Sequence, residues 1–209
     1  MNLLITGRHK IVFAISVILI NFFLISCAGE PEYTYEEYRK IKAIDTDESS
    51  VSREDLTSED EHRDEDGLQT YFDDLKDYNL YMKEFRALYD KYSAELITLI
   101  DDFGNETQDI DKKNQYAGSI KELEEKWVID LKEVEVPDFL IGHHDCFIGF
   151  LNSDVLYYKY FLEADLEKAN DSSQKADEYY EESSIELEAV ERSFNDRAES
   201  LDLELPFNY

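Results

Sequence analysis

The pattern of apolar residues between positions 68 and 103 constrains the fold of this chain more than any other feature. Side chains there recur in alternating steps of three and four residues, and every one of them is apolar or aromatic. This spacing places them on one face of an α-helix, so it predicts one long helix whose stripe faces a core. The stripe consists of Leu68, Tyr71, Leu75, Tyr78, Met82, Phe85, Tyr89, Tyr92, Leu96, Leu99 and Phe103.

A helix end and a new helix start are predicted directly after this stripe. Gly104 and Asn105 favour a helix end in the left-handed backbone conformation. Thr107 or Asp109 can then cap a second helix, because their side-chain oxygens accept hydrogen bonds from N–H groups of a first helical turn. The stripe of this second helix is weaker and comprises Tyr116, Ile120, Leu123, Trp127, Leu131 and Val134.

Pro137 predicts the start of a third helix, because proline fits the first helical turn and Asp138 places a negative charge at the positive end of the helix dipole. We expect this helix to run to about Lys168. Its apolar residues cover more than one face, which predicts that it is the most buried of the helices. They are Phe139, Leu140, Phe147, Phe150, Leu151, Tyr157, Tyr158 and Phe161.

The last predicted helix ends before Pro206 and carries the stripe Ala176, Tyr180, Leu187, Val190, Phe194 and Leu201. Asn170-Asp171-Ser172-Ser173 is typical of the loop before it. Because this loop lacks Gly and Pro, one long bent helix in place of the last two is the alternative. No segment alternates with the period of a strand. The sequence therefore predicts an all-α fold, either an antiparallel four-helix bundle or an elongated helical bundle.

The net charge limits the partners that this chain can bind. It has 209 residues with 21 basic and 50 acidic side chains, which give a formal net charge of −29. Such a surface repels the phosphate backbone of nucleic acids, so nucleic acid is not an expected partner. A basic protein or a cationic peptide fits the charge. The alternative is an acidic surface that only keeps the domain soluble.

The N-terminal segment has the layout of a secretory signal. Arg8 and Lys10 precede residues 11–25, which are almost wholly apolar. A basic start, a short apolar region and small residues at its end are the pattern of a cleaved signal peptide. This apolar run is shorter than the ~20 residues that span a bilayer. An uncleaved signal anchor is the alternative, and it too would place the rest of the chain outside the membrane.

Leu24-Ile25-Ser26-Cys27 ends this segment and resembles the lipobox of bacterial lipoproteins. The resemblance implies that Cys27 carries a diacylglycerol, with palmitate as the expected acyl chain, and becomes the mature N-terminus. Two acyl chains meet the requirement for stable anchoring. We therefore expect the protein at the outer, extracytoplasmic face of the cell membrane.

Three regions follow from this reading: a signal peptide at 1–26, a flexible acidic tether from the lipidated Cys27 to residue 67, and a helical bundle domain at 68–209. The tether is predicted from its low hydrophobicity and high charge, which favour disorder. In its series of amphipathic helices the body resembles helical-bundle lipoproteins of unknown function from Gram-positive bacteria.

His143-His144-Asp145-Cys146 is the only cluster of residue types suited to catalysis or ligand binding. On a helix, His143 and Cys146 share a face, whereas His144 points elsewhere. Both are weak candidates for a metal site, because a closed zinc site needs four ligands. A Cys146–His143 nucleophile pair and two core or interface side chains are the other interpretations. With Cys27 lipidated, Cys146 has no partner for an intrachain disulfide.

Residues 62–73 resemble part of an EF-hand calcium loop. Asp64, Asp66 and Gly67 occupy matching positions, but His62 stands where the first acidic ligand belongs and Asp73 where glutamate is usual. An acidic linker that leads into a helix N-terminus is the simpler interpretation.

Taken with the signal, these features favour a membrane-anchored lipoprotein that acts by protein contact. The alternative is a lipoprotein that binds a small ligand or a metal through the region of His143 and Cys146. An enzyme is not expected, because the sequence has no Gly-rich phosphate loop, no nucleophilic serine motif and no repeat of the Glu-x-x-His motif on two helices, as catalytic bundles have. No cofactor is predicted.

Overall fold

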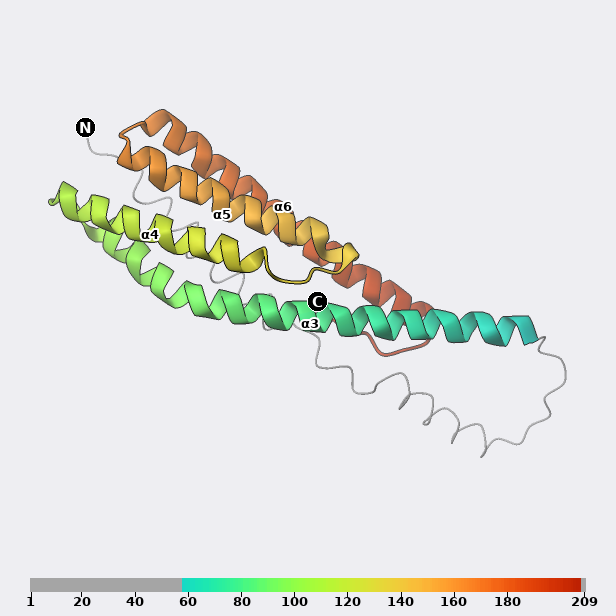
Figure 1. Ribbon diagram of the computed structural model, residues 1–209. Helices are drawn as coiled ribbons and strands as arrows, with labels where there is room; N and C mark the ends of the chain where they lie inside the picture. The colour runs from blue at the N-terminus through green and yellow to red at the C-terminus, as the bar shows by residue number, and fades with distance from the viewer. Residues whose placement is uncertain (1–57, 208–209) are drawn as a thin grey trace. The chain divides into compact units, whose positions relative to one another are not determined.

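The computed structural model describes residues 58–207, with their side chains from Asp66 onward. This part of the chain forms four α-helices and one 3-10 turn, and it contains no strand (Figure 1). The elements are α3 (Ser58–Asn105), α4 (Ile110–Leu131), η1 (Asp138–Leu140), α5 (Ile141–Leu162) and α6 (Leu166–Ser200). The predicted all-α helical bundle is thereby confirmed. The predicted signal peptide, Cys27 and the tether up to residue 57 lie outside the described residues.

Helix α3 begins ten residues before the stripe that predicted it. Its first residue is Ser58, whereas the stripe starts at Leu68. The prediction that the acidic tether extends to residue 67 is therefore wrong for residues 58–67, which are helical. The spacing of apolar residues could not reveal this start, because the stripe itself begins only at Leu68.

The described residues divide into two compact units. The first unit is Tyr81–Ala189 and contains α4, η1, α5 and the adjoining parts of α3 and α6. The second unit is built from residues 58–80 and 190–207, which are the start of α3, the end of α6 and the segment after it.

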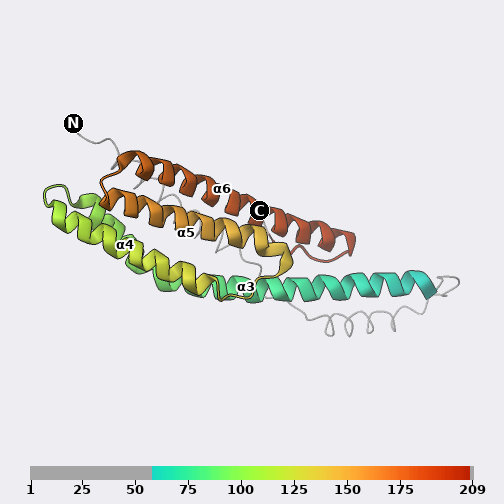
Figure 2. The same cartoon turned by 45° about the horizontal axis from the view of Figure 1, so that its top comes forward.

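Neighbouring helices in the first unit are antiparallel. The Tyr92 hydroxyl on α3 donates a 2.6 Å hydrogen bond to Oδ2 of Asp130 near the end of α4. Lys113 near the start of α4 lies with Nζ 4.7 Å from the ring centre of Phe103, near the end of α3. In both views α4 also runs beside α5 (Figures 1 and 2).

Aromatic rings fill the centre of the first unit. The Trp127 ring on α4 stacks on Tyr92, with centroids 5.6 Å apart, and meets Tyr89 and Phe147 edge to face at 5.7 and 5.5 Å. Three helices thus meet at one indole. Edge-to-face and offset pairs of this kind add to the stabilisation that burial provides.

The predicted stripe of α3 faces the core as expected. Every one of its residues is buried except Leu68 and Leu99, which are half-buried. Tyr81 and Ile100 are buried in addition, at 1% and 8% exposure. The core-facing surface of α3 is therefore wider than one strict heptad stripe.

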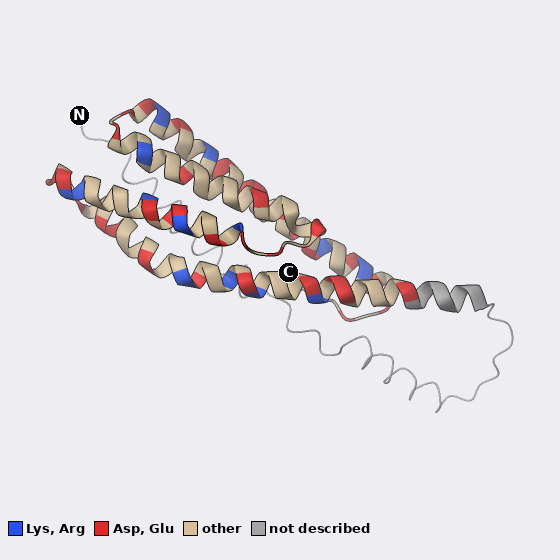
Figure 3. Ribbon diagram, in the orientation of Figure 1, with Lys and Arg blue, Asp and Glu red and all other residues tan. Residues whose placement is uncertain are grey.

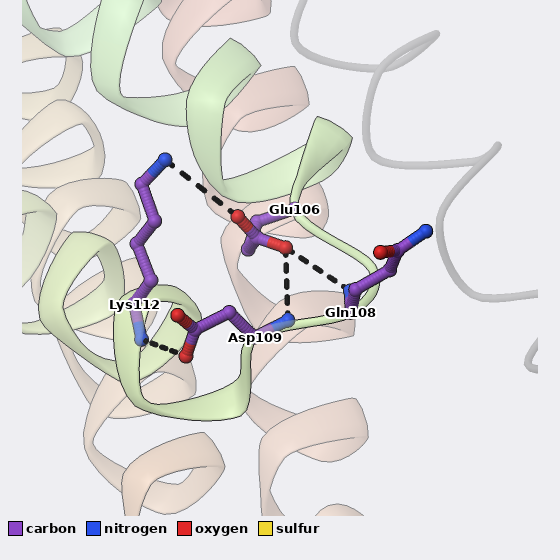
Figure 4. Close-up of polar contacts among 4 residues, drawn as sticks. All are labelled: Glu106, Gln108, Asp109 and Lys112. Carbon is purple, nitrogen blue, oxygen red and sulfur yellow. Dashed lines mark hydrogen bonds and ion pairs between the residues drawn. The ribbon is translucent and has the colours of Figure 1, made fainter.

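The turn between α3 and α4 is held by two carboxylates (Figure 4). Asp109 caps α4, since its Oδ1 accepts a 3.0 Å hydrogen bond from the N–H of Lys112. Glu106 Oε1 accepts the N–H groups of Gln108 and Asp109, both at 3.0 Å. These two hydrogen bonds lower the pKa of Glu106. Of the two predicted caps, Asp109 is the one that forms.

The predicted left-handed stop at Gly104-Asn105 is wrong in its geometry. Helix α3 does end at Asn105, but no glycine among the described residues has a positive φ. At this helix end the N–H of Glu106 bonds the Asp102 carbonyl at 3.0 Å, and the Glu106 carboxylate accepts the N–H groups of the turn that follows.

The boundary between the last two helices differs from the prediction. Residues 170–173 lie inside α6 and form no loop, and α5 ends at Leu162, before the predicted Lys168. The chain reverses at Ala164, whose φ is 58°. Asp165 then accepts the N–H of Lys168 at 3.2 Å and pairs with its ammonium at 2.7 Å, which stabilises the start of α6. The alternative of one bent helix is also excluded by this left-handed residue.

Helices α5 and α6 run antiparallel and approach closely at two glycines. A Cβ added at Gly142 would lie 2.8 Å from the Glu186 carboxylate, and one added at Gly149 would lie 2.9 Å from the Tyr179 ring. The two contacts have opposite order along the helices, as antiparallel packing requires.

The second unit is a pair of helix ends closed by an aromatic cluster. The Tyr78 hydroxyl donates a buried 2.7 Å hydrogen bond to Glu191, and Arg197 pairs with Asp74 at 2.7 Å. Helix α6 ends at Ser200, and the following turn contains Asp202 with a φ of 57°. Among the described residues, no helix is long and apolar enough to cross a membrane.

Candidate functional site

The predicted cluster 143–146 lies on the first turns of α5, which follows directly on the turn that Pro137 begins. His143 and His144 are both buried, at 5% and 6% exposure, and Cys146 is half-buried. As expected, His144 does not share the contacts of His143 and Cys146, which face Ser183 and Glu182 of α6, whereas His144 faces Tyr81 of α3. Successive residues of α5 reach two different neighbours, because this helix is covered on more than one side.

His143 is bonded to Ser183 of α6. Its Nδ1 lies 3.0 Å from the Ser183 carbonyl oxygen and 2.9 Å from the Ser183 hydroxyl. The hydroxyl also donates to the His143 carbonyl at 3.1 Å. A carbonyl can only accept, so Nδ1 carries the proton and Nε2 is left as an acceptor.

Nε2 of His143 is buried and has no hydrogen-bond partner among the described residues. The rings of Phe85 and Tyr81 lie next to the imidazole, with centroids 5.2 and 6.1 Å away. Burial lowers the pKa of His143 to about 4, although its hydrogen bond to Ser183 acts in the opposite direction. The imidazole is therefore neutral at physiological pH.

His144 turns toward α3 instead. Its Nδ1 lies 3.1 Å from the Tyr81 hydroxyl. Burial lowers the pKa of His144 and raises the pKa of Tyr81, so both groups are neutral. The pair is a polar contact inside an aromatic core and satisfies two groups that would otherwise be costly to bury.

Cys146 faces carboxylates. Its Sγ lies 3.8 Å from Oε2 of Glu182 on α6. Burial, and then the charges of Glu182 and Glu186, raise the pKa of the Cys146 thiol. A thiol that stays protonated is a poor nucleophile and a poor metal ligand.

The structure therefore gives His143 and Cys146 different partners and does not join them in one site. No described hydrogen bond links His143 to Cys146, because Ser183 and Glu182 take those positions. The described residues also contain no group of three or more His, Cys, Asp or Glu side chains placed to hold a metal ion. The arrangement in this region is that of packing contacts between α3, α5 and α6.

The EF-hand resemblance at residues 62–73 is contradicted by the backbone. Helix α3 runs without interruption from Ser58 to Asn105, so these residues form no loop. An EF-hand site requires a loop that wraps its ligands around the ion. The interpretation as an acidic stretch of helix remains.

A buried glutamate on α4, which interacts with a half-buried aspartate on α5, was missed by the sequence analysis. Glu124 on α4 is completely buried, and neither carboxyl oxygen has a donor among the described residues. Burial, followed by the charge of Asp154 on α5, raises the pKa of Glu124 well above its usual range. Glu124 therefore holds a proton at neutral pH.

A sequence signal for this pair did exist. Glu124 lies four residues after Ile120 and three before Trp127, which is core spacing on α4. Asp154 sits between the buried Ser153 and Tyr157 on α5. The pKa of the Tyr158 hydroxyl is also raised, first by burial and then by the neighbouring Asp154 and Glu124.

Comparison of the chain with protein families, with curated proteins and with solved structures finds no match.

Proposed function

We propose that this protein is a lipoprotein held at the outer face of the cell membrane by a diacylglyceryl group on Cys27, where it binds another protein. The observation that carries the proposal is the Leu24-Ile25-Ser26-Cys27 sequence behind the apolar residues 11–25. Two acyl chains would anchor the chain stably, and the bundle would stand outside the membrane.

The character of the described residues supports action by contact rather than by catalysis. His143 is neutral and bonded to Ser183, and the thiol of Cys146 is held protonated beside Glu182. Aromatic side chains fill the interior around Trp127. Recognition by such a bundle would use its outer surface.

The charge of α6 supports a basic partner. No lysine or arginine occurs between Lys175 and Arg192, and Glu178, Glu181 and Glu182 are exposed along this stretch. Acidic residues recur on α6 in Figure 3. Complementary charge raises the rate of encounter with a basic protein and favours correct partners.

The anchor is tested by mass spectrometry of the protein from the membrane fraction. We expect a mature chain that begins at a diacylated Cys27, and we expect the Cys27→Ala variant to keep its signal peptide and lose the lipid. Recovery of an unlipidated or uncleaved wild-type chain would refute the lipoprotein assignment.

The partner is tested by recovering the intact lipoprotein from detergent extracts and comparing two charge-reversal variants. Glu178→Lys with Glu181→Lys should reduce recovery of a basic partner, and the loss should resemble the effect of high salt. The matched control reverses two other exposed acids, Glu163 and Glu167, and should leave recovery unchanged. Repeated recovery of no membrane or secreted protein would count against an interaction module.

A further inference from the structure

Residues 201–207 of the second unit insert one aromatic side chain between two helices. Phe207 is 1% exposed. Its ring lies 5.1 Å from that of Tyr78 on α3 and 6.1 Å from that of Phe194 on α6, measured between centroids. Burial of a phenylalanine on this scale contributes about 1.5–3 kcal/mol.

A single amide side chain binds the backbone of this phenylalanine. Nδ2 of Asn195 donates to the Phe207 carbonyl at 3.0 Å, and Oδ1 of Asn195 accepts the Phe207 N–H at 3.1 Å. Asn195 is itself 9% exposed. This paired contact binds both the N–H and the carbonyl of one residue, as a neighbouring strand would. We call Tyr78, Phe194 and Asn195 the Phe207 slot.

The rest of the segment is attached less firmly. Within the described part of the chain, the last hydrogen bond between backbone groups after α6 joins the N–H of Leu203 to the Ala198 carbonyl. Glu204 and Leu205 beyond it are exposed. Beyond Leu203, the described contacts of the segment are those of Phe207.

We propose that the Phe207 slot also accepts the 201–207 segment of a second copy of this protein, so that two copies exchange these segments. The second copy is the occupant whose fit is already visible, because it carries the identical side chain and backbone. Exchange of an identical element is a low-cost route to a dimer, since it forms contacts that each monomer already makes.

The segment of the same chain competes with this exchange. A short connection gives it an effective concentration on the order of 1 mM in its own slot. Exchange should therefore be detectable when copies are crowded, or when the internal competitor is removed. In the full-length chain, two variants separate the copy that accepts the segment from the copy that supplies it. Phe207→Ala removes the side chain from its own slot, and Asn195→Ala damages the slot but keeps Phe207.

The test mixes these two variants in detergent and measures their masses by native mass spectrometry. Each variant alone should be a monomer, and the mixture should form a heterodimer through Phe207 of one copy in the slot of the other. In the control, the Phe207→Ala chain also carries Asn195→Ala, and its mixture should form no heterodimer. A heterodimer in that control, or none in the first mixture, would overturn the proposal.

A second measurement covers the case in which Phe207→Ala unfolds the second unit. A synthetic peptide of residues 201–207 should raise the Tm of Phe207→Ala at millimolar concentration, because it refills the slot. The same peptide with alanine at its last position should leave the Tm unchanged. Equal effects of the two peptides, or no effect of either, would also overturn exchange. Neither measurement depends on the lipid anchor or on a basic partner.

Discussion

His143 and Ser183 join α5 to α6 through hydrogen bonds that run in both directions. The imidazole Nδ1–H donates to the Ser183 carbonyl at 3.0 Å, and the Ser183 hydroxyl donates to the His143 carbonyl at 3.1 Å. This contact fixes the tautomer of the imidazole. It also fixes His143 as a neutral group, because a second proton would have to be placed on a buried Nε2 that has no acceptor among the described residues.

We predict that acid destabilises the first unit through His143. Burial lowers its pKa from 6.5 to about 4, so the unfolded chain binds a proton that the folded chain refuses. The contribution that the neutral His143 makes to the free energy of unfolding is therefore complete above pH 6.5, and it is lost as the pH falls from 6.5 toward 4. At ~1.4 kcal/mol per pKa unit, the loss approaches roughly 3 kcal/mol.

The measurement is the free energy of unfolding in urea for wild type and His143→Gln between pH 7.5 and 4. The variant cannot titrate, so the wild type should lose more stability than the variant across this range. An exposed polar change on the same helix, Asn152→Ala, is the control and should differ from wild type by a constant amount. A constant difference for His143→Gln as well would contradict the prediction.

Replacing a glycine by alanine should change the stability of the protein in opposite directions on α4 and α5. Gly118 on α4 has nothing within 4 Å of an added Cβ, so Gly118→Ala should stabilise the protein by about 0.5–1 kcal/mol through backbone entropy. At Gly149 the added Cβ would lie within 3.0 Å of three atoms of the Tyr179 ring. We expect Gly149→Ala to destabilise by about 1–3 kcal/mol, because the ring must move.

Thermal unfolding of the two variants measures this contrast. Gly142→Ala is the intermediate case, since the atoms it meets belong to the mobile end of the Glu186 side chain. Its Tm should lie between those of the other two variants. A Gly149→Ala protein as stable as Gly118→Ala would show that α5 and α6 do not approach as closely as the structure describes.

Asp109→Ala should cost about 1 kcal/mol, within the range of 0.5–2 kcal/mol for loss of a helix N-cap. The change removes the acceptor for the N–H of Lys112 and leaves the first turn of α4 without that bond. Asp111→Ala is the matched control, because Asp111 is exposed on the first turn and its described contacts include no capping bond. Chemical denaturation should separate the two variants, and equal losses would argue against Asp109 as the cap.

The sequence predicted the helices well where their apolar residues repeat over many turns. From Tyr71 to Phe103 the spacing identified one face of α3, because such a repeat has no other way to bury its side chains. It underestimated the width of that face, and Tyr81 and Ile100 were missed. Their burial depends on how many neighbours surround the helix, which the spacing along one helix does not specify.

The boundary between α5 and α6 could not be predicted in this way. Asn, Asp and Ser favour caps and turns, so residues 170–173 were interpreted as a loop. In the folded chain Ser172 is buried on α6, and the reversal occurs at Ala164 with a left-handed backbone. A single left-handed alanine gives no compositional signal, and only the cap at Asp165 marked the position.

The candidate site was harder to predict than the fold, because residue type alone directed attention to His143 and Cys146. A group with a strongly raised pKa is instead Glu124, an ordinary glutamate at a core position of α4. Its burial follows from the packing of α4 against α5, where it meets Asp154. The spacing of Glu124 fits the apolar stripe of α4, but a charged residue is not expected at a core position.

We predict that Glu124 makes the first unit less stable as the pH rises. Its folded pKa is raised by burial and then by Asp154, so above pH 4.5 the unfolded chain releases a proton that the folded chain keeps. The contribution of the protonated Glu124 to the free energy of unfolding is complete below pH 4.5, and it falls as the pH rises toward the pKa of Glu124 in the folded chain. Between pH 4.5 and 6.5 this trend opposes that of His143, so the wild-type profile alone conceals both.

Glu124→Gln separates the two effects. Glutamine has nearly the same shape, cannot ionise, and can donate an amide N–H to Asp154. The variant should therefore unfold at higher urea than wild type at pH 8, and the difference should shrink as the pH approaches 4.5. Glu122→Gln makes the same chemical change at an exposed position of α4 and should show no such trend. If both variants respond equally to pH, the carboxyl of Glu124 is not the group that titrates, and its burial between α4 and α5 does not set the alkaline limit of the bundle.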